Sequence, residues 1–307
     1  MAFTAKDVQR LREMTGVGMM DCKKALTESD GDFDKAIEFL REKGLAAAQK
    51  KAGRIAAEGV VYAKVCSKCG DAVIVEVNSE TDFVAKNEKF QAFVATVADV
   101  VLKTKPADVE ALLEKPYDDK QTVAAALQEL ILVIGENQKV RRFETIAGGE
   151  DILNVAYVHM GGKIGVLVSL KVDPAVKEKA EVAELAHDLA MQICAMNPAY
   201  LSRDVVPAEV LDKEREIARA KALEEGKPEK VIDRIVEGSL VKYYQEVCLL
   251  DQAYVKESKM SVAQHIAGVA KAVGGSVEVA KFVRFEKGEG LAKREENFAE
   301  EIAKLTK

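Results

Sequence analysis

The chain of 307 residues is 48% hydrophobic and carries a formal net charge of −6, and at this length two or more domains are expected. No apolar run approaches the roughly 20 residues that span a bilayer, and the first residues lack the basic and apolar segments of a secretory signal, so we expect a soluble, cytoplasmic protein with no membrane partner. Basic and acidic side chains are interleaved, which argues against a nucleic-acid partner.

The first 44 residues predict three short helices. Thr4 and Asp7 have the spacing of a capping box, and "TGVG" interrupts the helical pattern after the first helix. Gly44 is placed to end the third helix as its C′ residue. The basic run from Gln49 to Arg54 is expected to be a solvated linker in preference to an RNA contact. Because such a bundle has a small core, we expect it to lean on a partner or on the next domain.

The spacing of the apolar residues changes from helical to alternating after Gly59. Two alternating runs separated by "CSKCGDA" predict a β-hairpin. Their apolar residues are Val61, Ala63, Val65, Val73, Val75 and Val77. The segment "NSETDF" then turns the chain into a helix. The apolar face of this helix is predicted to contain Phe83, Phe90, Val94, Val97 and Val101.

The same order of elements returns between Ile152 and Met196, as a strand, a glycine-containing turn, a second strand, an elbow and a long helix. An ungapped alignment after the two elbows pairs Phe90 with Ala183, Val97 with Ala190 and Val101 with Cys194. We interpret this recurrence as an internal duplication of an α+β unit with antiparallel sheets.

Between Pro207 and Val247 the chain is highly charged and has a helical pattern that is interrupted once, by "EGKPE". Gly226 can end one helix and Pro228 can start the next, which predicts an antiparallel helical hairpin. Its apolar stripe must be covered by its own arms or by another subunit. Beyond it, "KFVRFEKGEG" predicts one more strand, and residues 291–307 predict a short amphipathic helix.

No motif predicts a cofactor, a bound nucleotide or an active site. The glycines of "GGKIG" and "GEG" lack the spacing of a phosphate loop or a dinucleotide fingerprint. The three histidines, His159, His187 and His265, show neither metal-ligand spacing nor a partner for acid–base chemistry, and His187 is expected to be packed and hydrogen-bonded within its helix. We therefore predict no metal site and no catalytic residue.

Cys66 and Cys69 form a C-x-x-C pair in the first predicted hairpin turn. A zinc site would need two more ligands, and the other three cysteines are isolated in the sequence. A thioredoxin-type redox pair lies at a helix N-terminus, whereas this pair lies between two strands. The simplest interpretation is two reduced thiols in a loop, and the zinc and redox alternatives stay open.

Asp82 and Phe83 follow Thr81 at the first elbow, and two interpretations of this pair compete. In one, Asp82 is a first-turn acid that gains roughly 0.3 to 1 kcal/mol from the helix dipole, and Phe83, in phase with Phe90, belongs to the core. In the other, the pair overhangs the sheet edge as an apolar anchor beside a hydrogen-bond acceptor, the form of an interface hot spot. Helical phase alone favours the core interpretation.

Two stretches, "LREMTGVGMMDCKKAL" from Leu11 to Leu26 and "EVNSETDFVA" from Glu76 to Ala85, closely resemble the two signature segments of the elongation factor Ts family. The resemblance continues through "EGKPEKVIDRIVEG" and "FVRFEKGEG", in the order of the family, and so covers nearly the whole chain. The inserted hairpin is similar to that of the long bacterial form, which can self-associate through it.

The resemblance also implies a division of this α+β chain into domains. Residues 1–54 would form a three-helix, ubiquitin-associated-like domain with its linker, and residues 55–142 the first core subdomain. The second core subdomain would comprise residues 143–206 and 247–287, with the coiled-coil hairpin of residues 207–246 inserted in it. Residues 288–307 would form a C-terminal helical module.

By this resemblance the chain is a nucleotide exchange factor and not an enzyme. It would bind elongation factor Tu in the GDP-bound and nucleotide-free states, disturb its magnesium and phosphate site, and promote GDP release during translation elongation. The segment from Thr81 to Val84 would enter the GTPase domain near the magnesium ion, with Phe83 in a pocket and Asp82 on the adjacent helix. The other implied partner contacts are Met19, Met20, Lys23, Ile134, Gly135, His159 and Val255.

The chain departs from the family pattern in three places. Val17 stands where the family has alanine, one residue is added between His159 and Gly161, and residues 103–122 form a longer excursion with no assigned role. A rival interpretation of the whole chain is an adaptor whose three-helix domain docks a different protein.

Overall fold

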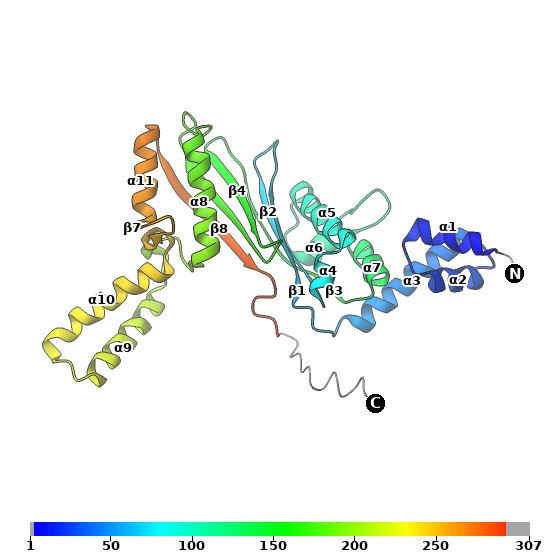
Figure 1. The fold of residues 1–307 in the computed structure, drawn as a ribbon, viewed down its shortest axis with the longest axis horizontal. Helices are drawn as coiled ribbons and strands as arrows, with labels where there is room; N and C mark the ends of the chain where they lie inside the picture. Colours follow the sequence, from blue (N-terminus) through cyan, green and yellow to red (C-terminus); the bar gives the residue numbers. More distant parts are fainter. Residues whose placement is uncertain (1–2, 293–307) are drawn as a thin grey trace.

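A computed structural model describes residues 3–292, and it confirms the α+β class. Helices flank antiparallel sheets in an elongated molecule, with the helices of residues 5–51 at one end and the helical hairpin of residues 208–247 at the other (Figure 1). Within the described range, every helix is too short or too polar to cross a membrane.

The first helices are α1 (Ala5–Thr15), α2 (Met19–Glu28) and α3 (Phe33–Lys51). The predicted capping box is confirmed, because the Asp7 amide donates to the Thr4 side chain and the Asp7 carboxylate accepts from the Thr4 amide. The prediction for Gly44 was wrong, since α3 continues past it to Lys51 and takes up the first part of the expected linker. Gly44 is buried where α3 packs against α7 (Val123–Ile134), and a Cβ there would lie at an ordinary contact distance of 3.4 Å from the backbone oxygen of Gln128.

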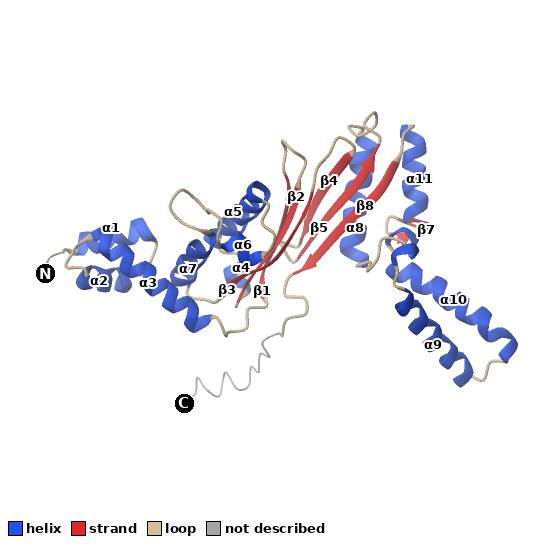
Figure 2. Ribbon diagram, turned by 180° about the vertical axis from the view of Figure 1, so that it is seen from behind, coloured by secondary structure: helices blue, strands red, loops and turns tan. Residues whose placement is uncertain are grey.

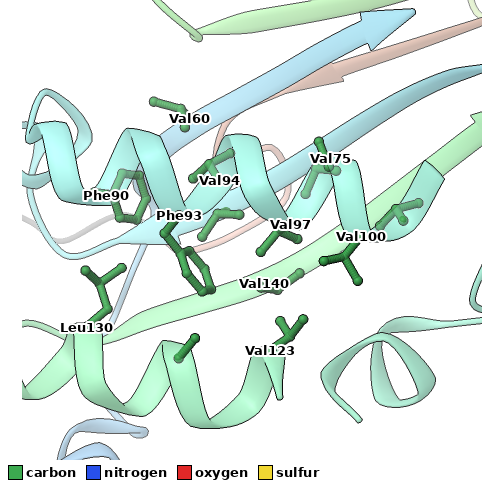
Figure 3. Close-up of a cluster of buried hydrophobic side chains, with 14 of the residues drawn as sticks. Val60, Val75, Phe90, Phe93, Val94, Val97, Val100, Val123, Leu130 and Val140 are labelled. Atoms are coloured by element: carbon green, nitrogen blue, oxygen red, sulfur yellow. The ribbon is translucent and has the colours of Figure 1, made fainter. Parts of the chain in front are cut away.

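The first sheet contains β1 (Glu58–Val65), β2 (Ala72–Ser79) and β3 (Gln138–Ile146) in that order, all antiparallel. Two helices, α5 (Glu88–Thr104) and α7 (Val123–Ile134), cover one face of it. Figure 3 shows the apolar side chains between these elements. They include Val60, Val75, Phe90, Phe93, Val94, Val97, Leu130 and Val140.

Residues 103–122 contribute to this first core. The short helix α6 (Val109–Leu113) buries Leu112 completely, and the Tyr117 ring stacks on Phe93 with 5.5 Å between ring centroids. The excursion therefore covers apolar surface that α5 would otherwise expose.

The second sheet contains β4 (Ile152–His159), β5 (Ile164–Val172) and β8 (Val277–Glu286), again in sequential order and antiparallel. Its outer face is covered by α8 (Ala180–Met196) and α11 (Val262–Val273), as Figure 2 shows from behind. Both sheets also have a register shift between their second and third strands. This shared order supports the predicted duplication, although the ungapped alignment fails at Ala183, which is exposed where Phe90 is buried.

The remaining elements lie around the second sheet. The hairpin consists of α9 (Ala208–Glu224) and α10 (Glu229–Val247), and its arms bury Ala218, Ala222, Ile232 and Val236 against each other. Two short strands, β6 (Ala253–Tyr254) and β7 (Glu257–Ser261), connect it to α11. The 3-10 turns span Arg203–Val205 and Leu249–Asp251. The domain limits drawn from the family resemblance remain predictions, and most of the predicted C-terminal module lies outside the described residues.

The inner faces of the two sheets pack against each other. Val61, Ile74, Leu167 and Phe285 form the centre of this layer. A Cβ at Gly165 would lie 2.5 Å from the Val61 side chain, so the close approach of the sheets requires a glycine there.

A buried carboxylate, that of Glu76 on β2, joins the two halves of the core. It accepts hydrogen bonds from Asn78 at 3.0 Å, Arg141 at 2.9 Å, Arg142 at 2.6 Å and the backbone amide of Gly288 at 2.7 Å. Burial alone would raise the pKa of Glu76, but these four donors outweigh burial and lower the pKa below its ordinary value. Since Gly288 follows β8, this carboxylate connects the first sheet to the end of the second.

We predict that Glu76→Gln lowers the free energy of unfolding by about 3 kcal/mol, because the variant removes a fully buried anion and leaves two partly buried guanidinium groups without their anionic partner. Glu144→Gln is the matched control on β3, where an exposed pair with Lys281 at 3.6 Å should contribute less than about 1 kcal/mol. Urea titration of the three proteins measures both values. An equal effect of the two substitutions would contradict the assigned role of Glu76.

The stabilisation by Glu76 should depend on pH. Because its pKa is lower in the folded protein than its ordinary value of 4.5, its contribution is complete above that value and is lost as the pH falls through the folded pKa. The stability difference between the wild type and Glu76→Gln should therefore shrink as the pH is lowered below 4.5. Urea titrations at several pH values test this, and a constant difference would exclude it.

Candidate functional site

The predicted helix after the first hairpin is in fact two helices. Thr81 caps α4 (Asp82–Ala85), and Asn87 then starts α5 by accepting from the amides of Lys89 at 2.9 Å and Phe90 at 3.4 Å. The extended backbone of Asn87 breaks the helical phase between Phe83 and Phe90. The spacing that suggested a common face therefore does not apply across the elbow.

Phe83 is not a core residue, because 80% of its surface is exposed. Its neighbours Val84 and Ala85 are buried and belong to the first core cluster. These two side chains hold α4 against the sheet, and they leave the Phe83 ring directed away from it. The core interpretation of Phe83 was wrong, and the geometry required by the hot-spot interpretation is present.

Asp82 lies beside this ring and is half exposed. One of its oxygens accepts from Lys86 Nζ at 2.7 Å, one helical turn along the chain. The hydrogen bond from Lys86 lowers the pKa of Asp82. The elbow thus presents an ionised acceptor next to an apolar ring.

Glu136 holds the elbow in place from a distant part of the chain. One of its carboxylate oxygens accepts from the Thr81 amide at 3.0 Å and the other from the Thr81 hydroxyl at 2.8 Å. Glu136 follows Gly135, which ends α7 in the left-handed region with φ of +89°. The family resemblance implied Ile134 and Gly135 and did not include Glu136, although an acid directly after a glycine was visible in "VIGEN".

Hydrogen bonds from Asn137 reinforce those that Glu136 makes to the elbow. The Asn137 amide donates to Glu80 at 2.5 Å, and the Asn137 side chain donates to the backbone oxygen of Arg54 at 2.8 Å. The segments before α4, after α7 and before β1 are therefore tied together. The predicted residues Thr81 and Gly135 lie close to each other for this reason, with Ile134 half-buried against the first core and Gly135 exposed.

His159 is the last residue of β4 and directly precedes the β4–β5 turn, which lies near the elbow end of the first hairpin. The turn is attached to β1, because the Val61 amide donates to the backbone oxygen of Gly162 at 2.8 Å. The His159 ring is half-buried and lies 2.9 Å from the Tyr157 hydroxyl, while the next residue, Met160, is exposed. His187 was predicted to be packed, but it is exposed on α8 with its ring edge-on to Tyr157.

The remaining predicted contacts lie away from the elbow. Met19, Met20 and Lys23 are on α2, at one end of the molecule, and Met20 is 74% exposed (Figure 1). Val255 lies on the other side of the sheets in the β6–β7 turn, near the base of the hairpin (Figure 1). The structure therefore brings together the Thr81–Val84 and Ile134–Gly135 segments, and places α2 and Val255 at separate points along a long surface.

The turn that contains Val255 is fixed by polar contacts, although the Val255 side chain itself is exposed. Its amide donates to Gln192 at 2.8 Å, and the flanking residues Tyr254 and Lys256 both contact the buried carboxylate of Asp188. This buried anion was not selected from the sequence, since its partners lie on a different element more than 60 residues away.

The described residues contain no cluster of three or more histidine, cysteine or acidic side chains that could hold a metal ion. What the elbow offers is an exposed aromatic ring, an ionised carboxylate and a rigid support. This combination is suited to binding another protein.

Comparisons with known proteins indicate the same family over nearly the whole chain. A family model described as Elongation factor TS matches residues 80–289. The chain is 53% identical over 301 residues to an Elongation factor Ts of Clostridium novyi (strain NT), covering 97% of each protein. It is 52% identical over 303 residues to the Elongation factor Ts of Clostridium perfringens (strain 13 / Type A), covering 99% of each. The chain therefore belongs to the elongation factor Ts family.

Proposed function

We propose that this protein is a guanine nucleotide exchange factor for elongation factor Tu. It binds the GDP-bound and nucleotide-free states, disturbs the magnesium and phosphate site, and so promotes GDP release during translation elongation. The observation that carries the proposal is the exposed Phe83 on an anchored elbow, within the range that matches the family. Exchange of this kind needs binding energy and no covalent chemistry.

The free energies involved are consistent with a mechanism in which the Phe83 ring inserts into the partner as a wedge. A nucleotide with nanomolar affinity is bound by about 12 kcal/mol, and each tenfold gain in release rate requires about 1.4 kcal/mol. Burying one phenylalanine side chain supplies roughly 1.5 to 3 kcal/mol. Phe83 alone can therefore account for one or two factors of ten, and the rest must come from other contacts, for which we propose Met19, Met20, Lys23, Ile134, Gly135, His159 and Val255.

Rigidity of the elbow is part of the proposed mechanism. A helix of four residues is not stable by itself, so α4 depends on its buried face and on the two hydrogen bonds from Thr81 to Glu136. A wedge that is already fixed loses little conformational entropy on binding, and more of its contact energy remains available to distort the partner. Because coupling is reciprocal, bound GDP weakens the affinity of elongation factor Tu for this protein by the same ratio as this protein weakens its affinity for GDP.

The direct test is the release of a fluorescent GDP analogue from elongation factor Tu. We expect the protein to accelerate release at catalytic concentrations. If it leaves the rate unchanged, the proposal is lost, and an adaptor function becomes the better explanation.

Phe83→Ala should slow the stimulated release by about 10- to 100-fold, since it removes the roughly 1.5 to 3 kcal/mol of the ring. Val205→Ala is the control, because Val205 is also exposed and lies in the turn before the hairpin. Both variants should melt at the wild-type temperature. A large loss of thermal stability in Phe83→Ala would instead restore a structural role for the ring.

Glu136→Ala should slow release by about tenfold, because Thr81 loses both acceptors and the elbow is no longer fixed. Glu136→Gln keeps one acceptor and should fall between the alanine variant and the wild type. Glu129→Ala, at an exposed position on α7, the helix that precedes Glu136, is the control. Hydrogen exchange provides the second readout: the Val84 amide should exchange faster in Glu136→Ala, and unchanged exchange there would refute the positioning role.

The hairpin supports one further part of the proposal, self-association. Ile217, Leu223, Val231 and Val241 remain exposed on α9 and α10. Sedimentation of the full chain across a range of concentrations tests whether two copies associate through these residues.

A further inference from the structure

Cys66 and Cys69 differ from the other cysteines in their surroundings. They occupy the turn between β1 and β2, where Cys66 is half-buried and Cys69 is exposed. Cys22, Cys194 and Cys248 are buried. Only the first pair thus combines proximity in the chain with access to solvent among the described cysteines.

The backbone of the turn brings the two thiols together. The Cys66 amide donates to the backbone oxygen of Asp71 at 2.7 Å, and the Gly70 amide donates to that of Cys66 at 2.9 Å. Gly70 has the positive φ of +73° that closes such a turn. The i→i+4 bond between Gly70 and Cys66 closes a single helical turn, in which residues three apart are neighbours with about 5–6 Å between their Cβ atoms. The two thiols are therefore close to the spacing of a disulfide.

The turn is also held from outside the hairpin. Asn154 on β4 donates to the backbone oxygen of Gly70 at 2.8 Å, and the Gly148 amide donates to the Asp71 carboxylate at 2.7 Å. A Cβ at Gly148 would lie 2.2 Å from the backbone oxygen of Cys69, so the two backbones are in close contact. A pair held in this way has a high effective concentration of one thiol at the other.

The two thiols have different chemical characters. Hydrogen bonds from the Cys69 thiol, and then from the backbone amides of Cys69 and Lys68, lower the pKa of Cys66. Donation to Cys66 raises the pKa of Cys69. Burial raises the pKa of the other three cysteines, that of Cys248 to about 11. Cys66 therefore has the highest thiolate fraction, and the thiolate is the reactive form.

We propose that Cys66 and Cys69 form a redox-active dithiol that reduces small-molecule disulfides and closes to an intramolecular disulfide. The Cys66 thiolate attacks one sulfur of the small disulfide, whose S–S bond breaks and releases a thiolate. Cys69 then gives its proton to solvent and attacks the Cys66 sulfur of the mixed disulfide, releasing the second thiolate. Two protein thiols are oxidised, and one small disulfide is reduced to two thiols.

The geometry favours this reaction over a structural zinc site. Tetrahedral zinc needs four ligands, and the described residues contain no group of three or more histidine, cysteine or acidic side chains that could hold a metal ion. The eight-residue strand β1 separates the turn from the elbow by roughly 23 Å at about 3.3 Å per residue. The dithiol is therefore independent of the proposed exchange surface.

The experiment uses the reduced full-length protein, treated with oxidised glutathione and then with an alkylating agent, and analysed by intact mass and peptide mapping. We expect the wild type to lose the mass of two hydrogens, with the new disulfide in the 66–69 peptide and the other three cysteines still alkylated. Cys69→Ser should stop at a glutathione adduct on Cys66. Cys66→Ser should react at least tenfold more slowly, and all three proteins should stimulate GDP release equally.

Three results would overturn the proposal. The first is a wild type that accumulates a stable adduct without closing to the disulfide. The second is Cys66→Ser reacting at the wild-type rate. The third is stoichiometric zinc in the purified protein that is lost in Cys66→Ser and protects the pair from glutathione.

Discussion

The buried carboxylate of Glu76 is the interaction on which the rest of this structure depends. A charge without access to water is costly unless it is fully hydrogen-bonded, so β2 can be buried along its whole length only if donors reach this group. Two of them, Arg141 and Arg142, come from the neighbouring strand, and a third, the Gly288 amide, comes from the segment after β8. The Arg142 guanidinium also lies 4.1 Å from the centre of the Phe285 ring. One anion therefore fixes how the first sheet meets the end of the second.

This frame explains how the elbow can be both exposed and rigid. β1 and β2 are in register from Glu58 opposite Ser79 to Val65 opposite Ala72, and the end that contains Ser79 leads directly into the elbow. There, the segment is tied to the residues after α7 through Thr81 and Glu136. The hydrophobic ring of Phe83 would gain free energy by folding back onto the sheet, but Val84 and Ala85 already occupy that position.

The sequence predicted those elements whose apolar residues repeat regularly and whose ends carry glycine, proline or capping residues. The first and second β-hairpins, α8 and the α9–α10 pair are of this kind. It did not predict α7, which is apolar on most sides, or β3, whose two arginines look solvent-facing until Glu76 is placed beside them. Gly44 was misjudged because a glycine that ends a helix and one that lies buried within a helix, against a neighbouring helix, look alike locally.

The candidate site was predictable only in part, for a related reason. The seven-residue interval from Phe83 to Phe90 fits one helix, and only the capping hydrogen bonds of Asn87 reveal two. Glu136 acts on a residue 55 positions away, and Glu76 on residues 65 and 66 positions away. Periodicity describes neighbours along the chain and carries no information on such pairs. The family resemblance selected the candidate segments without showing what holds them in place.

The exposure of Phe83 in the free protein has a consequence for the kinetics of association. Partners that must rearrange before docking associate slowly, whereas preformed surfaces associate at the ordinary rates of about 10⁵ to 10⁷ M⁻¹s⁻¹. With α4 already capped and anchored, no opening step precedes contact by the ring. For the proposed exchange factor, the lifetime of the complex is then set mainly by dissociation, and substitutions in the elbow should alter how long the two proteins remain together more than how quickly they meet.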